Sequence, residues 1–279
     1  MPMAEPMIVG ELRVDGVVDG GGRFRPDKTF RGTTPEMWKA HEDLLDEDGM
    51  LPLTLGGYLV RDGKRTVLID AGLGPGSLMG LSGGAMLDNL TALGVSPAEV
   101  TDVIFTHLHI DHIGWATQQG SVTFPNAVYR CALADWQHFM IEHKDTPDGY
   151  PGAENIPVNP HAVLVHATQL FQTYDGSGTV LPGIDIMAAP GHTPGSSIVV
   201  LSSGADRAML LGDVVHCPVQ LLELEWDGMM DVDPALAKKT RQALAREIEG
   251  QDIPVAAAHF PGLRFGRLLQ AQGKRSFVF

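Results

Sequence analysis

Short apolar runs that end in glycine or a polar residue recur along the chain, and this pattern predicts buried β-strands separated by turns. Residues 51–60 and 65–70 flank an Asp62-Gly63 turn, which is typical of a β-hairpin. Later runs of the same form end beside histidine or aspartate, and they cover residues 103–105, 184–189, 207–211 and 253–258. These four strand ends are where side chains for chemistry are expected.

Helices are expected where a capping residue precedes an amphipathic stretch. Thr34 and Pro35 open one such stretch, and Asp233 and Pro234 open another that Gly250 ends. Two more helices are predicted over residues 87–93 and 135–143. The chain therefore mixes strands with helices along its length.

Other segments have a weaker pattern. An opening strand is expected over residues 7–18, closed by the Asp19-Gly20-Gly21-Gly22 turn, and residues 72–84 are expected to form a flexible loop. Residues 122–129 suggest a strand interrupted by Pro125. Residues 146–160 are dense in proline, glycine and asparagine, which predicts a surface loop of the kind that often forms a lid.

The strongest chemical signal follows the strand at residues 103–105. His107, His109, Asp111 and His112 lie within six residues, in a segment where an extended or turning backbone lets His107 and His109 converge. Neutral imidazole and ionised carboxylate are ligands for zinc, iron or manganese. Four such groups exceed what one ion can take from so short a loop. The spacing therefore favours one ion at His107 and His109 and a second at Asp111 and His112.

Further ligands are available at the ends of the later strands. His192 lies on a turn between two prolines, Asp213 follows Gly212, and His259 ends the run at residues 253–258. A rigid sheet can aim side chains at its strand ends into a common cleft. We therefore expect these three residues to join the first cluster.

The order of these motifs resembles the metallo-β-lactamase superfamily in its binuclear form. The resemblance rests on the His107-x-His109-x-Asp111-His112 motif, then residues 191–195, Gly212-Asp213 and His259, with residues 68–72 as a further match. Residues 212–216 and 259–262 look most like the methyl parathion hydrolase and lactonase branch.

The resemblance implies a fold and a ligand set. The fold would be an αββα sandwich of two mixed β-sheets flanked by helices. His107, His109 and His192 would bind the first metal, and Asp111, His112 and His259 the second, with Asp213 bridging them. The two divalent ions would be zinc, with iron, cobalt or manganese as alternatives.

Composition narrows the class of protein. A net charge of −14 without a run of lysine and arginine argues against nucleic-acid binding. The sequence contains no stretch of 18 apolar residues of the kind expected for a membrane-spanning helix. Its two cysteines lie outside a CxxC pattern, which argues against a disulfide framework. We expect a cytoplasmic protein of one domain, residues 1–279, in which an extension (1–50) precedes the metal-binding core (51–262) and a tail (263–279) follows it.

The predicted chemistry is hydrolysis. Two neighbouring divalent ions can share a hydroxide as the nucleophile and polarise the carbonyl or phosphoryl group that it attacks. Asp111 could accept the proton of the nucleophile, and Asp213 would hold the two ions at their separation. A lactone or carboxylic ester is the first expected substrate and an organophosphate triester the second. A β-lactamase is a weaker alternative, because Asp111 followed by His112 departs from the cysteine-containing second site of that subgroup. A redox di-iron protein is another, because the flavin-linked members of the superfamily use a carboxylate where His109 stands.

One departure from the family concerns the residues after Asp213. Acyl-homoserine lactonases use a tyrosine shortly after this aspartate, and the chain has none between Asp213 and His259. His216 could substitute as a hydrogen-bond donor or proton shuttle, or could be structural. Trp115 is expected to pack in the core, with a place in the pocket wall as the alternative. The tail is expected to close the pocket or to form a homodimer contact. Four other histidines are expected to have no partner at ligand spacing: His138, His143, His161 and His166.

Overall fold

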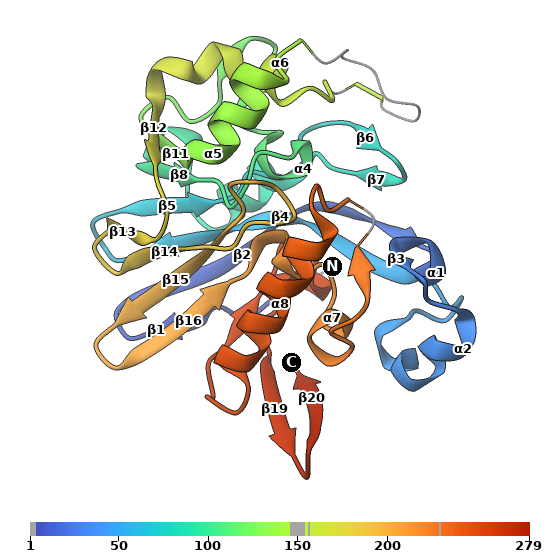
Figure 1. The fold of residues 1–279 in the computed structure, drawn as a ribbon. Helices are drawn as coiled ribbons and strands as arrows, with labels where there is room; N and C mark the ends of the chain where they lie inside the picture. The colour runs from blue at the N-terminus through green and yellow to red at the C-terminus, as the bar shows by residue number, and fades with distance from the viewer. Residues whose placement is uncertain (1–3, 146–153, 156, 229) are drawn as a thin grey trace.

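Two β-sheets form the body of the molecule, as the computed structural model in Figure 1 shows. The structure describes residues 4–145, 154–155, 157–228 and 230–279. The nine-stranded sheet has the order β12-β11-β8-β5-β4-β2-β7-β6, with β1 beside β2, and the five-stranded sheet has the order β13-β14-β15-β16-β18. Both are mixed, because β5 and β8 run parallel, as do β16 and β18, while most other neighbours run antiparallel.

The strands of the larger sheet are β1 (Met7–Val9), β2 (Leu12–Phe24), β4 (Leu51–Arg61), β5 (Thr66–Ile69), β6 (Ser77–Leu78), β7 (Leu81–Ser82), β8 (Asp102–Ile104), β11 (Val128–Ala132) and β12 (Phe171–Tyr174). Those of the smaller sheet are β13 (Gly178–Leu181), β14 (Ile184–Ala188), β15 (Ser197–Ser203), β16 (Asp206–Leu210) and β18 (Val255–Ala256). Three two-stranded ribbons pair β3 (Phe30–Arg31) with β17 (Asp227–Gly228), β9 (Thr117–Gln118) with β10 (Ser121–Val122), and β19 (Arg267–Ala271) with β20 (Lys274–Val278).

The α-helices are α1 (Pro26–Thr29), α2 (Pro35–Trp38), α3 (Met86–Ala92), α4 (Ile110–Ile113), α5 (Leu133–Asp135), α6 (Pro160–Leu164), α7 (Val219–Leu222) and α8 (Pro234–Ile248). A π-helix covers Trp136–Glu142, and short 3₁₀ segments cover Lys39–Leu44, Pro97–Glu99, Val165–Leu170, Gly212–Val214 and Pro261–Leu263. Within the described residues no helix is long and apolar enough to cross a membrane.

Three hydrophobic clusters define the layers. Between the sheets, β-strand residues such as Ile104 and Val199 share one cluster. On the outer face of the larger sheet a second cluster joins the strands to α3 and α6. On the outer face of the smaller sheet Ile198 and Val200 pack against α8 through Leu244, because neighbouring residues of a strand point to opposite faces. The expected αββα sandwich is thereby confirmed (Figure 1).

The glycines after Asp19 do not close the opening strand, so that prediction is wrong. Strand β2 continues to Phe24, with a shift of register between Val18 and Gly20. A Cβ atom on Gly20 would lie 1.9 Å from the carbonyl oxygen of Ser82, so glycine is present there because another strand passes close by. The bulge frees the Asp19 side chain, which turns inward.

Asp19 organises the segment predicted as a flexible loop. Its carboxylate accepts hydrogen bonds from the indole of Trp115, from the backbone amides of Leu73, Gly74 and Gly84 in that segment, and from the amide of Met86 just after it. Strands β6 and β7 also lie in this segment, so the loop is partly a hairpin. Trp115 is buried in the core, as expected.

Several predicted boundaries need correction. The helix opened by Pro35 lasts one turn and continues as a 3₁₀ segment, within which His41 leaves helical geometry. Residues 122–129 do not form one strand, since Pro125 separates β10 from β11, which belong to different sheets. The helix predicted at residues 135–143 begins two residues earlier and becomes a π-helix. Most of the predicted loop at 146–160 lies outside the described residues.

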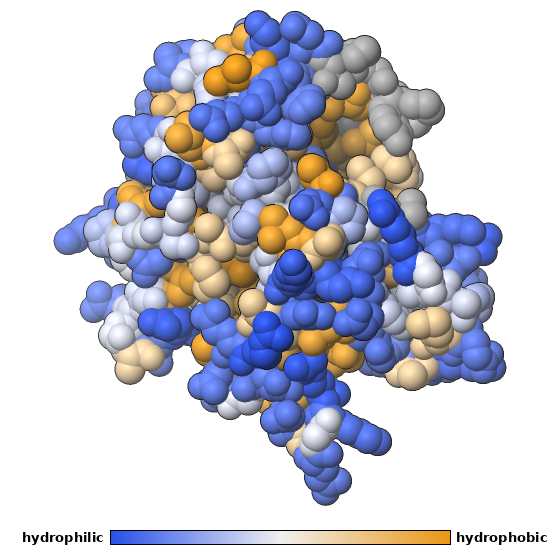
Figure 2. Space-filling model, in the orientation of Figure 1, coloured by the Kyte–Doolittle hydropathy of each residue, from blue (hydrophilic) through white to orange (hydrophobic). Residues whose placement is uncertain are grey.

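The extension and the tail pack on the same chain. Trp38 of the extension contacts Trp226, with ring centroids 5.0 Å apart, in a small cluster that also contains Cys217. The tail forms the β19–β20 hairpin, and Phe277 packs on Phe260, next to His259. Hydrophilic side chains cover most of the face in Figure 2, including this projecting hairpin, in keeping with the net charge of −14. A homodimer contact stays a prediction.

Candidate metal centre

The predicted ligands lie at strand ends on one edge of the sandwich. The chain leaves β8, places His107 in a loop and His109 in an extended conformation (φ −72°, ψ 155°), and then turns into α4. Asp111 and His112 lie on the first turn of α4. The extended backbone expected between His107 and His109 is therefore present.

The other strand ends supply the remaining groups. His192 follows β14, Asp213 follows β16 and His259 follows β18. Gly212 has a left-handed φ of 51°, and a Cβ atom there would lie 2.8 Å from the Cβ of Thr106. Glycine at this position therefore lets the Asp213 loop approach the histidine loop.

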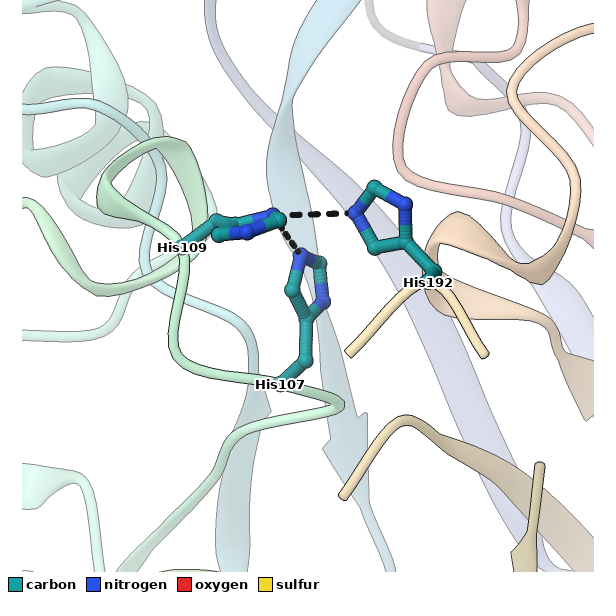
Figure 3. Close-up of side chains that lie close together, drawn as sticks. All are labelled: His107, His109 and His192. Atoms are coloured by element: carbon teal, nitrogen blue, oxygen red, sulfur yellow. Dashed lines mark hydrogen bonds between the residues drawn. The ribbon is translucent and has the colours of Figure 1, made fainter. Parts of the chain in front are cut away.

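Three imidazoles form the first group, and Figure 3 shows their rings pointing toward one another. The Nδ1 atom of His109 lies 3.1 Å from Nε2 of His107 and 2.9 Å from Nε2 of His192. The Nε2 atom of His192 is also 3.4 Å from Oδ2 of Asp213. Three nitrogen atoms and one carboxylate oxygen thus face a common point.

The second group shares Asp213 with the first. Nε2 of His112 lies 3.2 Å from Oδ1 of Asp213, and Nε2 of His259 lies 3.2 Å from Oδ2. The Asp111 carboxylate is 3.5 Å from Nε2 of His259 and 4.0 Å from Nε2 of His112. All seven predicted ligands therefore converge, with Asp213 between the two groups.

These residues fit divalent cations. His112 Nε2 and Asp213 Oδ1 face each other without hydrogen-bond geometry, so each is buried with no hydrogen-bond partner in the described structure. A buried polar atom without a partner is costly. Cations between the groups would satisfy both atoms, and imidazole with carboxylate is the donor set of zinc and related ions.

The pKa values of the two groups move in opposite directions. Burial, together with the neighbouring histidines, lowers the pKa of His107 and His192 and that of His109 to about 3, so these rings are neutral and able to bind metal. Burial also opposes charge on His259, but the Asp213 and Asp111 carboxylates outweigh it and raise its pKa to about 9. The carboxylates of the second group therefore favour a positive charge beside them, which a proton on His259 or a bound cation can supply.

Buried acceptors orient three of the imidazoles from behind. The Nδ1 atom of His112 bonds to Oδ2 of Asp70 at 2.9 Å, that of His192 to Oδ1 of Asp231 at 3.1 Å, and that of His259 to the carbonyl oxygen of Thr54 at 2.9 Å. Each contact directs Nε2 into the site. Asp70 adopts a left-handed backbone with φ 61°, a strained conformation for a residue other than glycine.

Asp135 joins the two loops that carry the first group. Its carboxylate accepts hydrogen bonds from the amide of Leu108 (3.0 Å), the hydroxyl of Thr193 (3.0 Å) and the amide of Gly195 (2.6 Å). Burial raises its pKa to about 6, so it is ionised at neutral pH. Asp70, Asp135 and Asp231 were not among the predicted site residues.

His216 lies beside the centre. Its Nε2 atom is 3.4 Å from Oδ2 of Asp213, and its ring stacks parallel to that of His259 with centroids 5.8 Å apart. Gln220 accepts a hydrogen bond from the backbone amide of His216 at 2.8 Å. His216 thus borders the centre, whereas Cys217 packs with the extension.

One expectation about the other histidines is wrong. His138 and Glu142 of the π-helix come together with its C-cap residue, His143, in a second group of potential ligands outside the centre. His161 and His166 are not among the ligand groups found in the described residues.

Comparisons with known proteins agree with this geometry. The sequence profile of the metallo-β-lactamase superfamily matches residues 57–259. Metallo-beta-lactamase domain-containing protein 1 of Xenopus laevis is 29% identical over 84% of this chain and 81% of its own length. The N-acyl homoserine lactonase AttM of Agrobacterium fabrum is 28% identical over 63% of this chain and 64% of its own length. The crystal structure of the hydrolase AbOPH, of the beta-lactamase superfamily, superimposes with a TM-score of 0.82 at 26% identity, covering 98% of this chain and 96% of that one.

Proposed function

The chain belongs to the metallo-β-lactamase superfamily and is a hydrolase of that superfamily, and we propose that it uses two divalent metal ions to hydrolyse a lactone or carboxylic ester. The observation that carries this proposal is the position of Asp213. Its carboxylate lies 3.2 Å from His112 on one side and 3.4 Å from His192 on the other, so it can serve both ligand groups. A single-ion site would not need two groups that share one carboxylate.

The proposed ligand sets follow the two groups. His107, His109 and His192 would hold one ion, Asp111, His112 and His259 the other, and Asp213 both. Bound divalent ions would polarise the carbonyl of the substrate and lower the pKa of water. Zinc suits the imidazole-rich set, as do iron, cobalt and manganese.

The side chains around the ions would handle the proton and the substrate. Asp111 is the partly exposed member of the second group, and its carboxylate lies 3.5 Å from Nε2 of His259, so it can accept a proton from the attacking water. His216 can donate a hydrogen bond to a substrate oxygen, because its ring lies at the edge of the centre. Neither step requires a serine or cysteine nucleophile.

A carbonyl substrate is favoured over a phosphotriester by the relatives. AttM is an N-acyl homoserine lactonase, and 63% of this chain aligns with it. The lack of a tyrosine between Asp213 and His259 separates this chain from the classical lactonase pattern. We therefore propose a lactone or ester of small size, without specifying an acyl-homoserine lactone.

Metal content and substrate preference test the proposal together. The purified protein, loaded with zinc, would be measured for metal per chain and assayed with lactones, aryl esters and an aryl phosphotriester. We expect two ions per chain and the highest kcat/KM on a lactone or ester. One ion or none after metal loading would refute the binuclear centre, and preference for the phosphotriester would refute the substrate class.

A further inference from the structure

A second group of histidine and carboxylate side chains lies on the π-helix at Trp136–Glu142 and on its C-cap residue, His143. The Nδ1 atom of His138 is 4.0 Å from Oε2 of Glu142, and the rings of His138 and His143 have centroids 4.3 Å apart. One ligand atom from each of the three residues lies within 4.8 Å of the others. We call this group the π-helix cluster.

The π-helical turn creates this cluster. The amide of His143 donates to the carbonyl oxygen of His138 at 2.9 Å, a bond that spans five residues. In an α-helix, residues five apart lie about 140° apart around the axis, so the two imidazoles would diverge. The wider π turn brings them to one side, and such turns are frequent at functional sites.

The chemistry of the cluster suits a borderline divalent cation. Burial and the neighbouring His143 lower the pKa of His138, so its imidazole is neutral at pH 7 and offers a lone pair. Glu142 adds a carboxylate, and its side chain is 64% exposed, so it can rotate toward a bound ion. Two imidazoles and a carboxylate resemble the donor sets that bind zinc, nickel or copper while leaving positions for water.

We propose that His138, Glu142 and His143 form an accessory divalent-cation site, separate from the binuclear centre. Phe139 lies between the two. Its ring is 4.7 Å from that of His138 and 5.6 Å from that of His109, both measured between centroids. A cation held by the π-helix cluster therefore lies one aromatic ring away from a ligand of the centre.

The accessory site is expected to bind a cation more weakly than the centre, because its side chains are more exposed. Glu142 and His143 are exposed, so a cation there competes with water and gains less from a fixed ligand geometry. The accessory site should fill only after the centre is loaded, and mild chelation should empty it first.

Calorimetric titration of the zinc-loaded protein with Ni²⁺, followed by metal analysis after gel filtration, tests the site. The wild type is expected to bind one further ion per chain, and His138→Gln/His143→Gln is expected to lose it. His161→Gln/His166→Gln is the matched control, since these histidines lie outside the cluster, and it is expected to bind as the wild type does.

Two more variants keep the test decisive. His143→Gln alone changes an exposed side chain and leaves His138 in place, so it is expected to fold normally and still to weaken Ni²⁺ binding. Asp213→Ala is expected to lose metal from the centre while it retains the accessory ion, which separates this proposal from the proposed function. Equal Ni²⁺ binding by the wild type and both His143 variants would overturn the accessory site.

Discussion

The proposed binuclear centre and the π-helix cluster contain the same types of side chain in different settings. In the centre, Asp70, Asp231 and the carbonyl of Thr54 hold three imidazoles from behind, and the ligands come from separate strand ends. In the π-helix cluster, the three ligands fall within a stretch of six consecutive residues, His138 to His143, at a partly exposed helix. If both groups bind cations, the buried and oriented ligands of the centre should hold an ion more tightly than the exposed ligands of the π-helix cluster.

Removal of the shared carboxylate should have the largest effect. Asp213→Ala is expected to lower the metal content of the centre below one ion per chain and to reduce kcat/KM by about 10³-fold or more, because both ligand groups lose a member and His112 and His259 lose their counter-charge. Metal analysis and steady-state kinetics on the same preparation measure both effects. Full activity in this variant would show that Asp213 serves neither ion.

A change to a residue that holds a ligand, without being a ligand itself, should have a smaller effect. Asp231→Asn keeps an acceptor for Nδ1 of His192 but removes the charge that orients the ring, so we expect metal affinity to fall by about 10-fold to 100-fold. Asp227→Asn is the matched control, since Asp227 also pairs with Arg241. A competitive chelator assay measures affinity, and equal losses in both variants would assign the effect to Arg241 instead.

The ligands were predictable from sequence because their signal is local. Four of them lie from His107 to His112, and the other three follow within three residues of an apolar run, so strand ends and spacing marked them as candidates. The full assignment of the seven to two ions came from the resemblance to the superfamily. The signal for the centre therefore lies in short segments and does not require knowledge of how the sheets pack.

The residues that support the ligands carry no such signal. Asp70 is 42 residues from His112 in sequence, and Asp231 is 39 residues from His192. Their roles depend on how the two sheets pack. The π-helix cluster was missed for another reason. On a regular α-helix of 3.6 residues per turn, His138 and His143 would point in different directions, and the sequence does not reveal the π turn that brings them together.

The link between the two loops of the first ligand group gives a stability prediction. In Asp135→Asn the amide NH₂ meets one of the amides that now donate to the carboxylate, either Leu108 N or Gly195 N. A buried donor without an acceptor costs about 1–3 kcal/mol. Denaturant unfolding of the metal-free protein measures the loss, and Asp206→Asn, an exposed change, is the control. An unchanged midpoint would show that the two loops do not depend on Asp135.

The same carboxylate predicts a pH dependence with a defined sign. Burial raises its pKa to about 6 in the native state, against about 3.9 when unfolded. The native state therefore binds the proton more tightly, and stability from this group falls as the pH rises from about 4 to about 6. The wild type should lose stability relative to Asp135→Asn across this range and stay parallel to it above. Parallel profiles throughout would contradict the shift.

The smallest effect is expected at His216, which borders the centre without belonging to the seven ligands. His216→Ala should lower kcat/KM by about tenfold, the equivalent of one hydrogen bond to a substrate oxygen, while metal content stays unchanged. His216→Gln retains a donor and should recover part of the loss. A pH–rate profile separates the two possible roles, because a proton shuttle would shift an apparent pKa in the alanine variant and a simple donor would not. Unchanged kinetics in His216→Ala would show that the ring only packs on His259, whereas loss of metal would make His216 an eighth ligand and remove the contrast between the centre and its border.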